Sequence, residues 1–415
     1  MGLVIKNGSF VDWETLEVKR TDITLDSADS EDSGKSNQVI DAEGKLVMRS
    51  FACAHHHAYS LLARGMPAPK QTPSNFHEIL KYIWWNLDRK IDSEMIRASA
   101  RGTALMCAKN GVSFVIDHHS SPQAASGSLE IMAQVFNELG VGHLLCLELS
   151  DRDGVEALKK SFFETEEFLK KNPETALIGL HASFTLSEET LEKTSALMKK
   201  YETGVHVHVA EDLIDQSECE KKYHMRVLER FQKHGLLDSS KTILAHGVHL
   251  SEREREVFNA SKAYLAVCTE SNQNNRVGVF SSRNLVPERI MLGTDGMHSD
   301  MLQSARSHYL QNHHTEGIDV RTAYKRLRNS HSYLAKNKIP GDSANNLVIY
   351  DYPSPTVIHS GNFLGHFFYG MTSADVDTVI SNGQVIVKNK KHTLADEQQI
   401  LAHCKEQGER LWKEL

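Results

Sequence analysis

Apolar residues gather in short runs along this chain, and from about residue 46 each run ends in polar residues and is followed by a stretch with helical periodicity. Short apolar strands that alternate with helices predict parallel strands joined by crossover connections. Eight runs fit this description: 46–57, 112–118, 141–149, 176–183, 204–211, 242–247, 263–270 and 290–296. Eight such units predict an α/β fold of the (β/α)8 TIM-like barrel type. A doubly wound open sheet is the structural alternative.

Three of the stretches between the runs carry helix signals at their ends. They cover residues 73–91, 127–140 and 187–204. The second lies between two glycines, and the third opens with Ser187 followed by Glu189, which predicts an N-cap with an acidic first turn.

The two ends of the chain have a different pattern, made of short β segments. Asn382-Gly383 separates two alternating runs, which is a strong hairpin signal. We therefore predict three parts: a small β-sandwich domain from residues 1–45 plus 340–395, a barrel over 46–339, and a C-terminal helix over 396–415. The acidic, serine-rich residues 25–38 are predicted to form a mobile loop.

Composition excludes several classes of protein. The 415 residues are 40% hydrophobic and 24% charged, and 47 Lys and Arg against 54 Asp and Glu give a formal charge of −7. These values exclude wholesale disorder, and the mild acidity argues against a nucleic-acid partner. We see no apolar run of about 18 residues and no secretion signal, so we expect neither a membrane span nor export. The six cysteines form no CxxC pair, which indicates a reducing, cytoplasmic location.

Histidine is abundant, with 23 copies, and several lie where predicted strands end. His55 and His57 end the first strand, and residues two apart on a strand point to the same side, so both imidazoles can reach one metal ion. His206 and His208 repeat this spacing on the fifth strand, and Glu211 follows. Each pair alone is also compatible with an ordinary polar rim.

Single candidates end three further strands. Asp295 lies in a Gly-flanked turn after the eighth strand, His246 ends the sixth, and His181 ends the fourth. Each alone would be read as structural, but the carboxyl ends of barrel strands meet on one rim, where such side chains converge. Three imidazoles and one carboxylate favour zinc or iron(II) at a hydrolytic site.

The motifs AHHHAYSLLARGM, LHASFTLS, HVHVAED, LAHGVHLS and LGTDGMHSD resemble those of the amidohydrolase superfamily. Within it the chain is most similar to the cytosine deaminase/triazine chlorohydrolase branch, and there to SsnA-type aminohydrolases, through IWWNLDRKID, VIDHHSSP and LGTDGMHSDM. The resemblance covers nearly the whole chain. It implies a metal-dependent hydrolase that acts on C–N bonds, and it also suggests a homodimer.

The resemblance assigns roles residue by residue. It implies that His55, His57, His208 and Asp295 are metal ligands, that Glu211 shuttles protons and that His246 orients the hydrolytic water with Asp295. His181 would contact substrate. The bridging lysine of binuclear relatives is absent from LHASF at the fourth strand, so one divalent ion per subunit is expected, zinc first and iron(II) as the alternative. Arg49-Ser50 replaces the usual Pro-Gly before the first motif.

Further side chains are candidates for binding a flat, small-molecule heterocycle. Phe184 could stack on it or plug the rim, and His118 and Asn272 end other strands. Successive helical residues point about 100° apart, so at most one of Trp84 and Trp85 is expected to face the cavity, and Trp84 is the candidate. Core packing is the alternative for both.

We therefore expect an aminohydrolase (deaminase) of a nitrogen heterocycle, with a purine-related ring as the candidate substrate. Two alternatives stay open: ring opening of a cyclic amide or imide by the same site, and a catalytically silent family member that serves as a binding subunit. Release of ammonia would distinguish deamination from ring opening. Metal analysis would distinguish an enzyme from a silent binding subunit.

Overall fold

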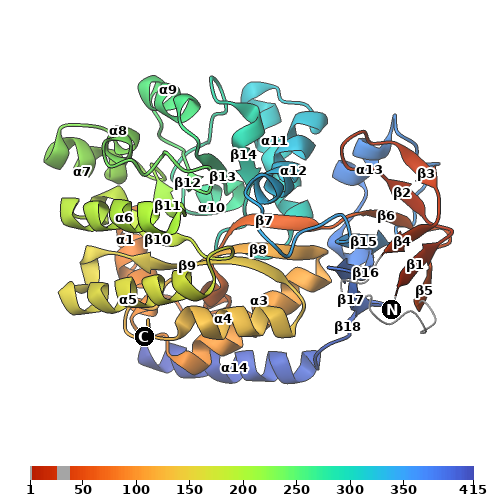
Figure 1. Cartoon of the computed structure of the whole chain (residues 1–415), viewed down its shortest axis with the longest axis horizontal. Coiled ribbons are helices and arrows are strands. Elements are labelled where there is room, and N and C mark those ends of the chain that lie inside the picture. The colour runs from red at the N-terminus through yellow and green to blue at the C-terminus, as the bar shows by residue number, and fades with distance from the viewer. Residues whose placement is uncertain (1, 26–37) are drawn as a thin grey trace.

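The computed structural model describes residues 2–25 and 38–415. The loop predicted over residues 25–38 lies outside the described residues apart from its two ends, Leu25 and Gln38, which are in strands. Figure 1 shows a barrel with its surrounding helices on one side of the molecule and small β-sheets, which contain the N-terminal strands, on the other.

Eight parallel strands form the barrel, as the sequence predicts. They pair in chain order from β7 to β14, and a bridge between His56 and Asp295 brings the last strand back to the first. The strands are β7 (Phe51–His56), β8 (Val112–His119), β9 (Gly142–Leu149), β10 (Ile178–Ala182), β11 (Val205–Val209), β12 (Ile243–His246), β13 (Tyr264–Val267) and β14 (Ile290–Leu292).

Helices connect these strands and cover the outside of the barrel (Figure 1). The α-helices are α1 (Phe76–Ile79), α2 (Trp85–Asp88), α3 (Ser93–Lys109), α4 (Ser128–Glu138), α5 (Val155–Lys171), α6 (Glu188–Tyr201), α7 (Leu213–Tyr223), α8 (Val227–Lys233), α9 (Glu252–Ala260), α10 (Thr269–Asn274), α11 (Met301–Glu316), α12 (Val320–Lys336), α13 (Phe363–Tyr369) and α14 (Glu397–Glu414). Short helical turns are η1 (Ala58–Ala63), η2 (Leu80–Trp84), η3 (Asp151–Asp153), η4 (Ser183–Thr185), η5 (Pro287–Arg289) and η6 (Ser373–Asp375).

The helix signals of the sequence are confirmed at two ends. The Ser187 hydroxyl accepts a hydrogen bond from the Thr190 backbone N–H at 3.2 Å, which caps α6. Gly127, in the left-handed conformation, is the N-cap of α4.

Strands from both termini form the other sheets. One has the order β18-β17-β16-β15-β6-β2-β3 and the other β4-β1-β5. Their bounds are β1 (Leu3–Lys6), β2 (Ser9–Val11), β3 (Val18–Arg20), β4 (Ile23–Leu25), β5 (Gln38–Asp41), β6 (Leu46–Arg49), β15 (Leu347–Tyr350), β16 (Val376–Ser381), β17 (Gln384–Lys388) and β18 (Lys391–His392). The Asn382-Gly383 hairpin is confirmed: both residues have positive φ, 48° and 78°, and join β16 to β17.

The first predicted strand, 46–57, is two strands instead of one. β6 ends at Arg49 and pairs with β15 and β2 in the terminal sheet, whereas β7 starts at Phe51 and pairs with β8 in the barrel. Both halves are buried on every residue, and the buried polar pair Arg49-Ser50 lies where they meet. The boundaries of the three predicted domains stay a prediction.

The inside of the barrel leads directly to the rim. Alternate residues of the strands form a buried cluster that includes Phe114 and Ile116 on β8 and Cys146 on β9. Two residues further on, the same alternation reaches His118 and Glu148, which are buried polar residues. The carboxyl ends of the strands therefore aim polar groups into a buried environment.

Among the helices of the described residues, none has the length and apolar character that a membrane span requires.

Candidate metal centre and active-site cavity

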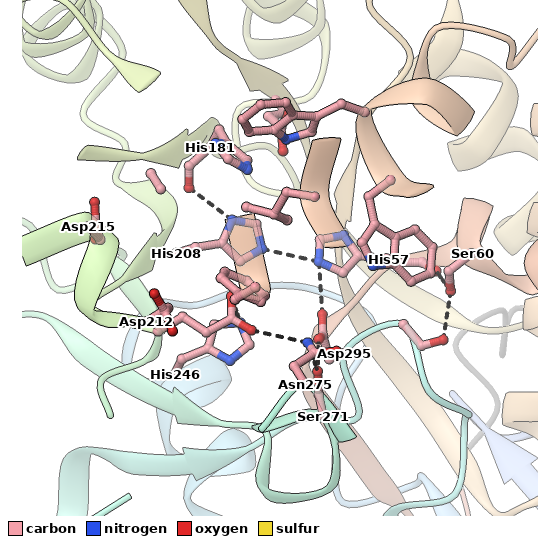
Figure 2. A pocket seen from close by; sticks show the side chains of 18 of the residues that line it. His57, Ser60, His181, His208, Asp212, Asp215, His246, Ser271, Asn275 and Asp295 are labelled. Atoms are coloured by element: carbon pink, nitrogen blue, oxygen red, sulfur yellow. Dashed lines mark hydrogen bonds and ion pairs between the residues drawn. The ribbon is translucent and has the colours of Figure 1, made fainter. Parts of the chain in front are cut away.

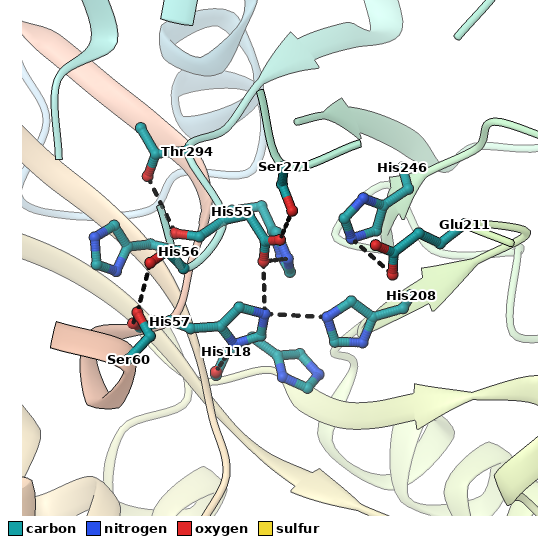
Figure 3. Close-up of polar contacts among 12 residues, drawn as sticks. His55, His56, His57, Ser60, His118, His208, Glu211, His246, Ser271 and Thr294 are labelled. Atoms are coloured by element: carbon teal, nitrogen blue, oxygen red, sulfur yellow. Dashed lines mark hydrogen bonds and ion pairs between the residues drawn. The ribbon is translucent and has the colours of Figure 1, made fainter. Parts of the chain in front are cut away.

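The four ligands that the resemblance implies lie together at the carboxyl ends of three strands. Nε2 of His57 lies 3.1 Å from Nε2 of His208 and 3.0 Å from Oδ1 of Asp295. Nε2 of His55 lies 3.3 Å from the same carboxylate oxygen. Figure 3 shows His57 and His208 facing each other, with His55 behind them.

The hydrogen bonds of the two histidines fix which ring nitrogens point inward. Nδ1 of His57 donates to the backbone carbonyl of His118 at 2.6 Å, and Nδ1 of His208 donates to that of His181 at 2.9 Å. In neutral imidazoles the two Nε2 atoms are then unprotonated. Two lone pairs and a carboxylate oxygen face one another, which is unfavourable unless a cation lies among them.

The residues present therefore fit a divalent metal ion. Tetrahedral zinc with bonds of about 2.0–2.1 Å separates its ligand atoms by about 3.3 Å, close to the spacing seen here. The pKa of His57 is raised to about 9 by the hydrogen bond and charge of Asp295, although its burial acts in the opposite direction. A positive charge is thus favoured at this point.

Supporting contacts hold the ligands in place. Nδ1 of His55 lies 2.8 Å from Nε2 of the buried His206, and Oδ2 of Asp295 accepts a hydrogen bond from the Ser271 hydroxyl. Partners of this kind fix the orientation of metal ligands. His206 was noted in the sequence only as half of an HxH pair; the structure places it behind His55.

Three residues of the site have left-handed backbone conformations. The φ angles are 47° at Ala210, 72° at His246 and 53° at Asp295. This region costs a residue other than glycine roughly 1–2 kcal/mol. Ala210 directly follows β11, His246 ends β12 and Asp295 lies three residues after β14, so the surrounding fold holds these positions at the rim at this cost.

Gly293 carries a packing constraint between β14 and β7. A Cβ atom at this position would lie 2.8 Å from both Cβ and O of His55 and 2.9 Å from its N. We expect Gly293→Ala to push the two ligand strands apart, to weaken metal binding and to lower the free energy of unfolding by about 1–3 kcal/mol. Urea denaturation and chelator competition measure the two effects.

Gly365→Ala is the matched control for this change. Gly365 lies inside α13, and a Cβ atom there would meet no atom within 4 Å. Alanine should be tolerated or slightly stabilising in this helix. Equal metal affinity in the two variants would contradict the constraint at Gly293.

Two proton-carrying groups lie next to the ligands. Nε2 of His246 is buried without a hydrogen-bond partner among the described residues and lies 3.6 Å from Oε2 of Glu211. Nδ1 of His246 donates to Oδ1 of Asn272 at 2.9 Å, so Nε2 is available as an acceptor. Burial raises the pKa of Glu211 to about 7, which suits a group that takes and returns a proton near neutral pH.

These side chains open into one cavity of about 880 Å³, its open mouth included. Figure 2 shows His57, His181, His208, His246 and Asp295 converging on it. Its other walls combine five aromatic side chains with polar and aliphatic ones. The aromatic side chains are Tyr59, Phe76, Trp84, Trp85 and Phe184. A cavity of this size and character fits a flat heterocycle together with a substituent.

The predicted substrate residues divide into two groups. His181, Phe184 and Trp84 line the cavity, whereas His118 and Asn272 lie behind its wall. Nε2 of His118 donates to the carbonyl of Leu180 at 3.0 Å, and Asn272 supports His246 as described. Both are completely buried and support ligands or proton carriers.

The expectation that at most one tryptophan faces the cavity is wrong. Trp84 and Trp85 both line it. The segment between α1 and α2 is a π-turn, Leu80–Trp84, in which successive side chains are separated by a smaller angle than in an α-helix.

Sequence reasoning missed a second polar group on the cavity wall. Asp88 and Arg152 line the cavity together with Glu148 of β9. On their own, a charged residue at a helix end and another in an acidic turn resemble a solvated surface, so no sequence signal marked them.

Comparison with known proteins agrees with this site. Residues 46–333 match the model of the amidohydrolase family. A 5-methylthioadenosine/S-adenosylhomocysteine deaminase of Aquifex aeolicus (strain VF5) is 25% identical over 396 residues, which cover 92% of this chain and 91% of the relative.

Two solved structures share the fold at 17% identity. One is a zinc-bound adenosine deaminase from Xanthomonas campestris, with a TM-score of 0.83 and coverage of 99% of this chain and 98% of the other. The second is the atrazine chlorohydrolase of Arthrobacter aurescens TC1 complexed with zinc, with a TM-score of 0.81 and coverage of 98% and 100%.

Proposed function

The chain belongs to the amidohydrolase family, and from this premise we propose that it is a metal-dependent deaminase of a purine-related heterocycle. The observation that carries the proposal is the position of His57 Nε2, which lies 3.1 Å from His208 Nε2 and 3.0 Å from Asp295 Oδ1, near Glu211, whose burial raises its pKa. The name of the Aquifex aeolicus relative describes a deaminase of adenosine derivatives, and this supports the substrate class that we propose.

His55, His57, His208 and Asp295 would hold the ion. When bound, a divalent ion supplies Lewis acidity and lowers the pKa of a bound water from about 15.7 toward neutrality. We propose one ion per subunit, zinc first and iron(II) as the alternative, because the four-ligand set contains no bridging lysine.

The side chains of the chain account for the proton movements. Glu211 takes a proton from the attacking water and passes it to the ring nitrogen, while Nε2 of His246 accepts a hydrogen bond from the same water. The water oxygen bonds to the ring carbon as a hydroxyl. Glu211 then takes the remaining hydroxyl proton and delivers it to the exocyclic amine, the C–N bond breaks, ammonia leaves and a carbonyl group remains on the ring. His181 and the aromatic wall hold the ring.

A substrate screen tests the proposal. Metal-loaded protein is incubated with 5-methylthioadenosine, S-adenosylhomocysteine, adenosine, guanine, cytosine, a pterin and a hydantoin, and ammonia and ultraviolet absorbance are followed together. We expect ammonia from at least one purine compound in step with the absorbance change. A new carboxylate without ammonia would instead show ring opening, and no turnover with no bound metal would show a silent binding subunit.

Assembly and location complete the proposal. We propose that the enzyme works on a small molecule in the cytoplasm as a homodimer, without nucleic acid or membrane as a partner. Light scattering of the purified protein measures the mass that a homodimer requires.

A further inference from the structure

Three charged side chains meet on the cavity wall away from the metal ligands. Asp88 ends α2, Glu148 lies on β9 and Arg152 lies in η3. Nη2 of Arg152 lies 2.6 Å from Oδ2 of Asp88, and its Nη1 lies 2.7 Å from Oε1 of Glu148. The three side chains are 3%, 4% and 7% exposed. All three line the cavity, and the proposed hydrolytic step uses none of them.

When both carboxyl groups are ionised, this cluster of Asp88, Glu148 and Arg152 has one negative charge in excess; burial raises the pKa of Asp88 to about 7. Two carboxylates share one guanidinium, and the nearby Asp153 is balanced by Arg89, whose Nε lies 2.6 Å from its Oδ1. Oδ1 of Asp88 is buried and has no hydrogen-bond partner among the described residues. A buried carboxylate oxygen without a donor is costly, so the cluster is incomplete in the free protein.

The cluster lies beside the residues that would hold the reacting ring. The guanidinium of Arg152 lies 5.3 Å from the centre of the Trp85 ring, and that ring lies 5.9 Å from the ring of His181. Oε2 of Glu148 lies 3.9 Å from Nδ1 of His118, whose carbonyl orients His57. A substituent on a ring held against His181 can therefore reach the cluster past Trp85.

We propose that the Asp88, Glu148 and Arg152 cluster selects the part of the substrate outside the reacting ring, by binding a substituent that donates hydrogen bonds and rejecting an anionic one. The donor is a hydroxyl or an amine, and it completes the coordination of the Asp88 carboxylate. A site built around such an unpaired acceptor discriminates strongly against analogues without the donor. The inference rests on the proposed deaminase function.

Asp88→Asn is the direct test because it keeps the shape of the side chain and removes its charge. Four compounds with one base are compared: adenine, adenosine, 5′-amino-5′-deoxyadenosine and adenosine 5′-monophosphate. The metal-loaded wild type should convert adenosine or its amine with a kcat/KM at least about 100-fold above that of the monophosphate. In Asp88→Asn the ratio of kcat/KM for adenosine or its amine to kcat/KM for adenine and for the monophosphate should fall at least about tenfold, mainly through a higher KM for adenosine or its amine. Adenosine and 5′-amino-5′-deoxyadenosine are then compared with each other. The one whose kcat/KM falls more in Asp88→Asn identifies the donor as hydroxyl or amine.

Asp153→Asn is the matched control. Oδ2 of Asp153 lies 3.0 Å from Nε of the same Arg152, but Asp153 is not among the residues that line the cavity. It removes an ion pair of Arg152 outside the cavity and leaves the contacts of Arg152 with Asp88 and Glu148 in place, so the preference should stay as in the wild type. If Asp88→Asn melts at a much lower temperature, Glu148→Gln takes its place, with the same expected loss.

The outcomes separate the inference from the proposed function. Ammonia release with equal preferences in the wild type and Asp88→Asn would overturn the inference and leave the function standing. If neither these four compounds nor any purine of the substrate screen releases ammonia, the function is overturned, and calorimetric binding to the metal-loaded protein decides the inference. Binding of adenosine or its amine that weakens at least about tenfold in Asp88→Asn supports it, whereas equal binding or none overturns it.

Discussion

Glu211→Gln is expected to lower kcat about 10³-fold while the protein keeps its metal, because general acid–base groups contribute about 10²–10⁴-fold. Glutamine fills the same space next to His246 but cannot accept the proton of the attacking water. Glu211 is not one of the four proposed ligands, so metal content should not change. Ammonia release under saturating substrate and metal analysis of the same sample measure both quantities.

Glu218→Gln is the control for this change. Glu218 lies on α7, close to Glu211 in the sequence, but its side chain is 47% exposed and lies 3.5 Å from Lys221. We expect wild-type turnover in this variant. Turnover within about threefold of the wild type in Glu211→Gln would contradict the assigned role, since it is far below the range for a proton carrier.

Asp295→Asn is expected to remove the metal without unfolding the protein. Asp295 supplies the negative charge that Nε2 of His55 and His57 face at 3.3 and 3.0 Å. An amide in its place donates N–H groups to these nitrogens and so satisfies the site without a cation. Bound metal should fall below about a tenth of an ion per chain, and turnover should decrease at least about 10³-fold.

The melting temperature separates metal loss from unfolding. Without metal, Asp295→Asn should melt within a few degrees of the metal-free wild type, because the amide still hydrogen-bonds His55 and His57 although it loses the charge that raises the pKa of His57. Asp300→Asn is the control: Asp300 caps α11 through the Gln303 backbone N–H at 3.0 Å, and asparagine caps equally well. Loss of metal in both variants to the same extent would argue against a specific role for Asp295.

Much of the fold and of the metal centre is predictable from the sequence for one physical reason. The apolar strands and their polar ends are local patterns, and parallel strands bring all those ends to one rim. His57, His208 and Asp295 therefore meet although 238 positions separate the first from the last. The Asn382-Gly383 turn is equally local, since both residues tolerate positive φ.

The parts that sequence reasoning missed depend on side-chain packing between distant segments. The polar pair Arg49-Ser50 stands where 46–57 divides into two strands, but it is buried like the rest of the run and does not by itself predict which sheet each half joins. Whether Asn272 contacts substrate or His246 is decided by a hydrogen bond between α10 and the end of β12. Asp88 and Arg152 become a buried pair only because α2 and η3 close over the same cavity.

Anomalous X-ray scattering from crystals of the metal-loaded protein tests the central claim most directly. Data collected on both sides of the zinc absorption edge should show one strong peak per chain, bonded to Nε2 of His55, His57 and His208 and to a carboxylate oxygen of Asp295. A peak at a different set of side chains, or none at this position at full zinc loading, would contradict the account.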